Sequence, residues 1–298
     1  MKVYYSDHFS LPLPEGHRFP IEKYALLRKR VMANGIITNG NAIVPPQATL
    51  DQLRLAHNPE YVQRVINGEL SEKEVRRIGF PWSLGLVQRS RRSVGGTIAA
   101  CRTALQEGVS ANLAGGTHHA FPDHGEGYCV FNDCAVAARA MQAENRVRSV
   151  VILDCDVHQG NGTAAIFAQD PSVFTFSIHG AKNFPFHKEP SDLDIALPDG
   201  CGDDQYLDSL RQGLEQSLAR AGAGLAIYLA GADPFEGDRL GRLALSKPGL
   251  VKRDRLVFSL CGEAGIPVAV TMSGGYADCV DDSVDIHYQT IKIAAQYH

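Results

Sequence analysis

The sequence lacks the features that mark several large classes of protein. Its seven cysteines are an odd number without a CxxC pair, which argues against a disulfide framework and a cysteine-rich structural zinc site. No apolar run reaches the about 18 residues of a membrane helix. The first residues also lack the basic stretch and long apolar core of a signal peptide. From these absences we expect a cytoplasmic protein without a membrane partner.

An excess of basic charge is also missing. The chain holds 29 Lys and Arg against 33 Asp and Glu, a formal net charge of -4, so we expect no direct nucleic-acid partner. One local basic cluster, formed by Arg89, Arg91 and Arg92, is interpreted as a solvated helix face without a function. With 44% hydrophobic residues, the chain has the composition of a globular protein that buries a large core.

From about residue 110 onward, short apolar runs alternate with amphipathic stretches, which predicts βαβ units and a mostly parallel sheet. Strands are predicted at 111–114, 150–154, 173–177, 225–230 and 268–272, and another near residues 2–5. Helices are predicted at 24–32, 59–66, 84–105, 135–141, 206–221 and 251–261. Asn132 or Asp133 and Asp203 or Asp204 are candidate helix caps. No linker or repeat interrupts the pattern, so we expect one domain over residues 1–298.

Polar or glycine-rich clusters follow five of these strands. In an open parallel sheet, ligands bind beyond the carboxyl ends of the strands, so these clusters are the candidate site. They are GGTHH at 115–119, DCDVH at 154–158, SIH at 177–179, GAD at 231–233 and SGGY at 273–276.

The DCDVH cluster predicts a metal site. If the chain stays extended, Asp154, Asp156 and His158 point to one side, and their crowding calls for a cation or a proton. Asp233 could add an oxygen ligand from another strand. Two carboxylates and one imidazole suit zinc with an open coordination position, although iron(II) and cobalt(II) fit the same ligands. The alternative interpretation is a set of solvated loop and turn residues.

Two further clusters carry groups that could move protons. The adjacent His118 and His119 could divide acid and base work in a metal cleft, whereas a lone histidine is more often a hydrogen-bonded core residue. Tyr276 follows two glycines, and a flexible turn could bring its hydroxyl toward a reacting carbonyl. The alternative for Tyr276 is a packed aromatic ring.

Taken in order, these motifs resemble the histone deacetylase family over roughly residues 12 to 290. The resemblance implies the arginase/deacetylase fold, an α/β three-layer sandwich with a mostly parallel central sheet of about eight strands. The stretches at 154–162, 236–241 and 249–254 look most like class IV of that family.

The resemblance also implies roles for individual residues. Zinc would bind Asp156, His158 and Asp233, and Asp154 would hold His118. The general base and then acid would be His119, with Asn161 at the place where class I enzymes have a carboxylate. Tyr276 would donate to the oxyanion, Gly127 and Tyr128 would line the substrate tunnel, and Arg18 would lie by an inner channel. A potassium ion is implied near Asp154, Asp156, His158, Ser177 and Ile178.

The implied reaction is removal of an acyl group from the lysine side chain of a peptide or protein. Acetyl is the default, and class IV makes long fatty acyl groups a second option. An acetylpolyamine amidohydrolase and a non-catalytic acyl-lysine binding module are the alternatives. A binuclear ureohydrolase of the same fold is disfavoured because the Asp-x-His-x-Asp ligand run that it needs is replaced here by Val157-His158-Gln159-Gly160, without a second carboxylate.

Overall fold

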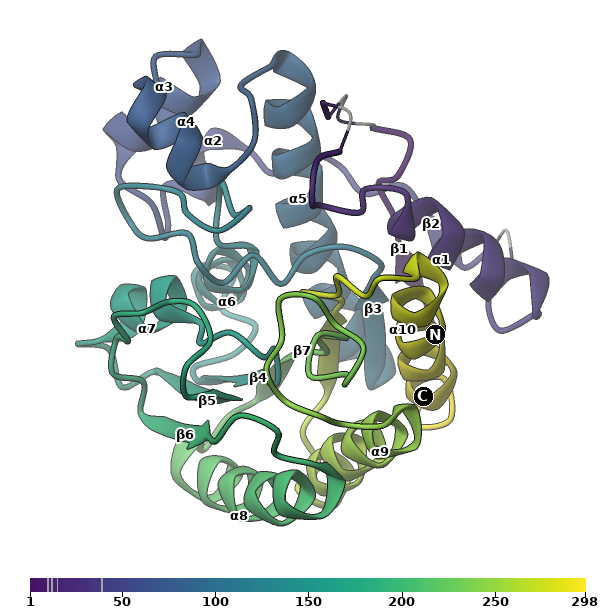
Figure 1. Ribbon diagram of the computed structural model, residues 1–298. Helices are drawn as coiled ribbons and strands as arrows, with labels where there is room; N and C mark the ends of the chain where they lie inside the picture. The colour runs from purple at the N-terminus through teal and green to yellow at the C-terminus, as the bar shows by residue number, and fades with distance from the viewer. Residues whose placement is uncertain (10, 12, 15, 39) are drawn as a thin grey trace.

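An eight-stranded sheet runs through the centre of the computed structural model, which describes residues 1–298 apart from 10, 12, 15 and 39 (Figure 1). The strand order is β2-β1-β3-β8-β7-β4-β5-β6, and every neighbouring pair is parallel. The strands are β1 (Val3–Tyr4), β2 (Ala42–Ile43), β3 (Val109–Asn112), β4 (Val150–Asp154), β5 (Val173–Gly180), β6 (Leu193–Leu197), β7 (Leu225–Leu229) and β8 (Val268–Thr271). The expected α/β class and parallel sheet are confirmed.

Alternate residues of the central strands face two different hydrophobic clusters. In β4, Ile152 belongs to one cluster, and its neighbours Val151 and Leu153 belong to the other. The same alternation holds in β7, where Ile227 and Tyr228 face opposite sides. Strands buried on both faces read as continuous apolar runs, which is why these two are plain in the sequence.

Helices cover both faces of the sheet and complete the three-layer sandwich (Figure 1). On one face lie α5 (Leu84–Glu107), α6 (Asp133–Ala143) and α7 (Asn161–Phe167). The other face carries α1 (Lys23–Ala33), α8 (Asp203–Ala221), α9 (Lys247–Glu263) and α10 (Val280–Ala294). Three short helices pack with the first group, namely α2 (Leu50–Leu53), α3 (Pro59–Asn67) and α4 (Glu72–Ile78). In the part of the chain that is described, none of the helices has the length and apolarity to span a bilayer.

Two local predictions need correction. The residue before α8 is Gly202, and no side chain of the described residues caps this helix. The carboxylate of Asp203 instead accepts hydrogen bonds from the backbone N and the hydroxyl of Ser246. The basic cluster on α5 is not a solvated face. Arg91 and Arg92 donate to the carbonyls of Ala48 and Pro45, both at 2.9 Å, and so anchor the preceding segment to α5.

Candidate active site

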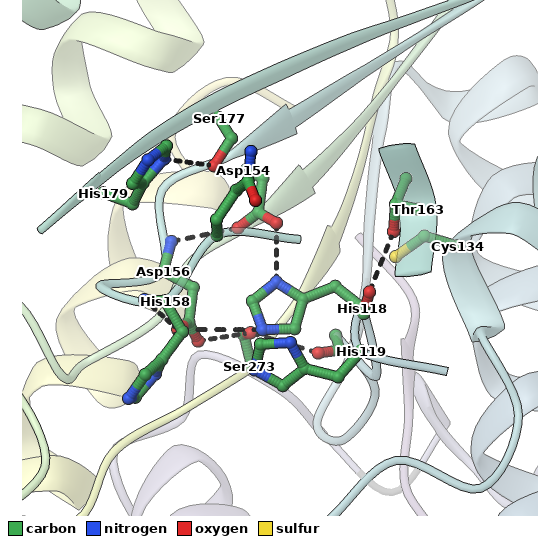
Figure 2. A network of polar contacts seen from close by, with 12 residues as sticks. His118, His119, Cys134, Asp154, Asp156, His158, Thr163, Ser177, His179 and Ser273 are labelled. Atoms are coloured by element: carbon green, nitrogen blue, oxygen red, sulfur yellow. Dashed lines mark hydrogen bonds and ion pairs between the residues drawn. The ribbon is translucent and has the colours of Figure 1, made fainter. Parts of the chain in front are cut away.

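Four neighbouring strands bring the polar clusters to one edge of the sheet. Strands β3, β8, β7 and β4 lie side by side and are parallel, so their carboxyl ends meet there. The segments that follow them hold the clusters at 115–119, 273–276, 231–233 and 155–158. Figure 2 shows His118, His119, Asp156, His158 and Ser273 gathered at this edge. The convergence expected from the strand ends is therefore present.

The three expected metal ligands lie together. Single ligand atoms of Asp156, His158 and Asp233 are all within 4.8 Å of one another, and all three residues are buried. The Nδ1 atom of His158 lies 2.9 Å from an oxygen of Asp156 and 3.2 Å from Oδ2 of Asp233. Among the described residues, that Oδ2 atom has no aligned hydrogen-bond donor. A buried carboxylate oxygen without a donor is costly, and a cation at this point would offset the cost.

The pKa values of Asp233 and His158 also indicate that positive charge is favoured at the trio. Burial and the nearby charge of Asp156 raise the pKa of Asp233 to about 7. Burial alone would lower the pKa of His158, but its hydrogen bond to Asp156 and the nearby charges of Asp156 and Asp233 outweigh this and raise the pKa to about 10. Two carboxylates and one imidazole at these distances fit an ion such as zinc, with a coordination position left open.

Neighbouring loops hold the two carboxylates in place. Asp156 accepts hydrogen bonds from the hydroxyl of Ser273 at 2.7 Å and from the backbone N of Gly274 at 2.8 Å. Asp233 accepts one from the backbone N of Val157 at 3.0 Å. Only glycine fits at 274, because a Cβ atom there would lie 2.7 Å from an oxygen of Asp156 and closer still to Asp233. The loop after β8 is thus built around the ligands.

Asp154 differs from the sequence prediction. Strand β4 ends at this residue and the chain then bends, so its carboxylate does not join those of Asp156 and Asp233. It faces His118 instead, as Figure 2 shows. Its Oδ2 atom lies 2.6 Å from the His118 Nδ1 atom. This contact is the one that the family resemblance implied.

His118 and His119 lie with ring centroids 4.1 Å apart and have opposite electrostatic surroundings. Burial would lower the pKa of His118, but the charges of Asp154 and Asp156 raise it to about 9. The pKa of His119 is well below its usual value because of burial and the two positive neighbours His118 and His158. At neutral pH the pair therefore combines a protonated and a neutral imidazole. Groups whose pKa values are pushed apart in this way suit acid and base work.

Tyr276 is 8% exposed and its ring centroid lies 6.4 Å from that of His158. Burial and the charges of Asp156 and Asp233 keep the pKa of its phenol well above the usual value, so the hydroxyl stays a donor. Its backbone N donates to Asp238 at 2.6 Å, and Asp238 also accepts from Leu240 and Gly241. The motif at 236–241 had pointed to Asp238 only through the family resemblance.

Two side chains that hold the loops of the site were not predicted from the sequence. Lys23 of α1 is 1% exposed, and its Nζ atom donates to the carbonyls of Ser273 and Gly275, 3.2 and 3.3 Å away. Asp133, expected only as a helix cap, accepts from the backbone N atoms of Gly116 and Thr117 and so holds the histidine loop. Of the two predicted caps, the structure shows Asn132: its side-chain oxygen accepts a hydrogen bond from the backbone N of Ala135, three residues on.

A narrow cavity adjoins two members of the trio, Asp156 and His158. It has a volume of about 40 Å³, and Gly127, Tyr128 and Tyr276 line both this cavity and a wider opening of about 770 Å³ above it. Phe184 lines the opening, with its ring centroid 4.9 Å from that of His119. The prediction for Arg18 is wrong, because it lines the outer opening. Among the described residues that line the inner cavity, the cation is Arg89.

Ser177 and Ile178, implied as potassium neighbours, lie in β5. Ser177 pairs with Asp154 in the register of β4 and β5, and its hydroxyl is 3.0 Å from Nδ1 of His179. A potassium ion beside them stays a prediction.

Comparison with known proteins gives consistent matches over nearly the whole chain. The family described as "Histone deacetylase domain" matches residues 17–291. An uncharacterised protein of Picosynechococcus sp. is 47% identical over 96% of this chain and 95% of its own. Histone deacetylase 2 of Arabidopsis thaliana is 28% identical over 96% of this chain and 78% of its own. The crystal structure of an HDAC homolog complexed with SAHA has a TM-score of 0.85, with 22% identity, over 99% of this chain and 84% of that one.

Proposed function

Because the chain belongs to the histone deacetylase family, we propose that it is a zinc-dependent amidohydrolase that removes an acyl group from the lysine side chain of a peptide or protein. One observation carries the proposal: two members of the trio, Asp156 and His158, line a narrow cavity together with a pair of histidines with separated pKa values. A binding module would need the cavity but not this pair.

Each side chain then has a task in the hydrolysis. Asp156, His158 and Asp233 would hold zinc, and the bound ion would act as a Lewis acid on the amide carbonyl and lower the pKa of a bound water to about 7. His119, neutral before the reaction, takes a proton from the attacking water as general base. The Tyr276 hydroxyl donates to the oxygen on which negative charge develops. His119 or the protonated His118 then gives a proton to the departing amine.

A direct test of the proposal is hydrolysis of acyl-lysine peptides by the purified protein with zinc. We expect release of free lysine peptide and a loss of activity with a metal chelator that zinc restores. Acetylated polyamines are measured beside the peptides. Preferred turnover of the polyamines, or binding of peptides without hydrolysis, contradicts the proposal.

The charge around the wide opening predicts acidic flanks on the substrate. The described residues that line it include one acid, Glu126, and several cations, which are Arg18, Arg76, Arg77, Lys182, Arg239 and Arg242. Carboxylates partner some of these cations, for example Asp199 beside Arg242 at 3.2 Å. A polyamine or a lysine-rich tail would meet repulsion here.

Peptides with aspartate or glutamate beside the acyl-lysine are therefore expected to show a lower KM than the same peptides with lysine or arginine there. The difference is expected to shrink at high salt, because exposed charges are screened. Arg77→Gln, which removes one exposed cation, should also reduce the difference in KM between acidic and basic flanks. Equal KM values for acidic and basic flanks at low salt would show that the opening does not select by charge.

The size of the inner cavity predicts a short acyl group. One water molecule needs about 10 to 15 Å³ of cavity volume. The inner cavity, at about 40 Å³, therefore suits a group of the size of an acetyl. A second cavity of about 150 Å³ lies beyond it, and Tyr24 and Arg89 line both. The Arg89 guanidinium lies 4.9 Å above the Tyr24 ring, so these two side chains separate the cavities.

Arg89→Ala is expected to join the two cavities and to admit longer acyl groups. The ratio of octanoyl to acetyl kcat/KM should rise at least about tenfold, since accommodating even one further methylene contributes about 1 to 3 kcal/mol. Arg91→Ala, a change on the same helix away from both cavities, is the control. An unchanged ratio in Arg89→Ala would mean that this side chain does not limit acyl length.

A further inference from the structure

A chain of two hydrogen bonds leads from His119 to a carboxylate at the mouth of the cavity. The His119 Nδ1 atom lies 2.7 Å from Oδ1 of Asn161, and Nδ2 of Asn161 donates to Oε1 of Glu126 at 2.9 Å. His119 and Asn161 are 4% and 3% exposed, whereas Glu126 is half-buried and lines the wide opening. Neither the sequence motifs nor the proposed reaction gives Glu126 a role.

The carboxylate decides which way the Asn161 amide points. An amide has an acceptor oxygen on one side and a donor NH2 group on the other, and an ionised carboxylate only accepts. Glu126 therefore binds the NH2 side and leaves the oxygen toward His119. The reversed amide would set its oxygen against the carboxylate. Leaving these polar groups unpaired would disfavour the reversed amide.

The amide in turn decides where the His119 ring carries its proton. The Asn161 oxygen can only accept, so the proton of the neutral ring lies on Nδ1 and the lone pair on Nε2. A reversed amide would present NH2 to Nδ1 and move the ring proton to Nε2. We propose that Glu126 is a positioning residue that, through Asn161, keeps Nε2 of His119 free to accept a proton.

The backbone around Glu126 is built to hold this geometry. Glu126 and Cys129 exchange two backbone hydrogen bonds of 3.0 and 2.9 Å across a tight turn. Its central residues, Gly127 and Tyr128, have φ angles of 54° and 67°, as in a type I′ turn. Position 127 also needs glycine because a Cβ atom there would lie 2.7 Å from Cδ2 of His119. The turn thus packs against the ring whose tautomer Glu126 controls.

A simpler role for Glu126 would be a solvated carboxylate that interacts with arriving substrate. Such a role would change KM and would leave the His119 ring as it is. A positioning role would change kcat and the tautomer, so the two roles separate cleanly. The inference rests on the base function proposed for His119, but the tautomer is measured without substrate.

The test compares variants that differ only in the acceptor at position 126. Glu126→Met and Glu126→Ala remove the acceptor, whereas Glu126→Gln removes the charge and keeps a carbonyl oxygen for Asn161. Asp123→Asn, a carboxylate of the same loop that does not contact Asn161, is the matched control. Loss of an orienting partner typically lowers activity about 10- to 100-fold. We expect that loss in kcat for the Met and Ala variants, with KM little changed, and near-normal kcat for Glu126→Gln and Asp123→Asn.

Nitrogen-15 NMR of histidine-labelled protein provides the second readout, with His119→Gln used to assign the His119 signals. We expect the ring proton on Nδ1 in the unsubstituted protein and in Glu126→Gln, and a substantial share on Nε2 in Glu126→Met and Glu126→Ala. Thermal unfolding shows which variants are folded. Unchanged tautomers in folded Met and Ala variants, or an equal loss of kcat in Met and Gln variants, overturns the inference. If no acyl-lysine peptide is hydrolysed at all, the proposed function fails, and the tautomer result still decides the role of Glu126.

Discussion

Tyr276→Phe is expected to lower kcat on an acyl-lysine peptide by a factor of roughly 100 to 1,000, about 3 to 4 kcal/mol, while the protein keeps its metal. The substitution removes only the hydroxyl, whose high pKa keeps it a donor beside the trio. The backbone N of residue 276 still donates to Asp238, so the loop stays in place. A hydroxyl that acts mainly on the charge of the transition state contributes little to binding, so KM should change little.

The control for this prediction is Tyr4→Phe. Tyr4 is 8% exposed, like Tyr276, but lies in β1 and bonds through its hydroxyl to Thr103. The Tyr4→Phe variant should have a lower free energy of unfolding, and each folded molecule should keep its full activity. Full activity of Tyr276→Phe with metal bound would show that the reaction does not use this hydroxyl.

Asp233→Asn is expected to lose both metal and activity, and yet to be at least as stable as the metal-free parent at pH 8. The change keeps an oxygen for the backbone N of Val157, so the local hydrogen bond survives. It removes a buried carboxylate whose pKa is raised to about 7 by burial and by Asp156. A carboxyl whose pKa is raised in the folded state lowers the free energy of unfolding as the pH rises from its ordinary pKa of 3.8 to about 7, because the unfolded chain ionises first. At pH 8 this loss is complete, so removing the carboxylate removes it.

Metal content by elemental analysis and thermal unfolding in chelator check this prediction. Asp199→Asn, which changes a carboxylate at the rim of the opening, should retain its metal. If Asp233→Asn bound zinc as the parent does, or unfolded at a much lower temperature than the metal-free parent, Asp233 would be a structural residue and not a ligand.

How far the sequence predicted the structure depended on how locally each feature is encoded. Strand β4 was predicted at its observed limits, because a strand buried on both faces is a continuous apolar run. Strand β6 was missed because its residues alternate between half-buried and exposed at the sheet edge, so they form no such run. The two-residue strand β2 has no length over which a period could be recognised.

The same reasoning applies to the site. The ligand trio and the histidine pair lie in short motifs at strand ends, so a parallel sheet was enough to bring them together. Lys23 was missed because it binds backbone carbonyls 250 and 252 residues away, and any sequence presents those. Arg18 was assigned wrongly because it lies in a loop whose path no periodicity constrains.

The place of β8 in the sheet has a consequence for synthesis of the protein. Although β8 is the last strand along the chain, it lies between β3 and β7, and it is the only strand joining β2-β1-β3 to β7-β4-β5-β6 in the described sheet. A ribosome-bound chain that stops before residue 268 therefore holds two separate sheet fragments, each with an exposed edge that can pair wrongly. Ser273 and Gly274, which donate hydrogen bonds to Asp156, follow β8 in the chain and are synthesised after it. The metal site is therefore completed late in translation.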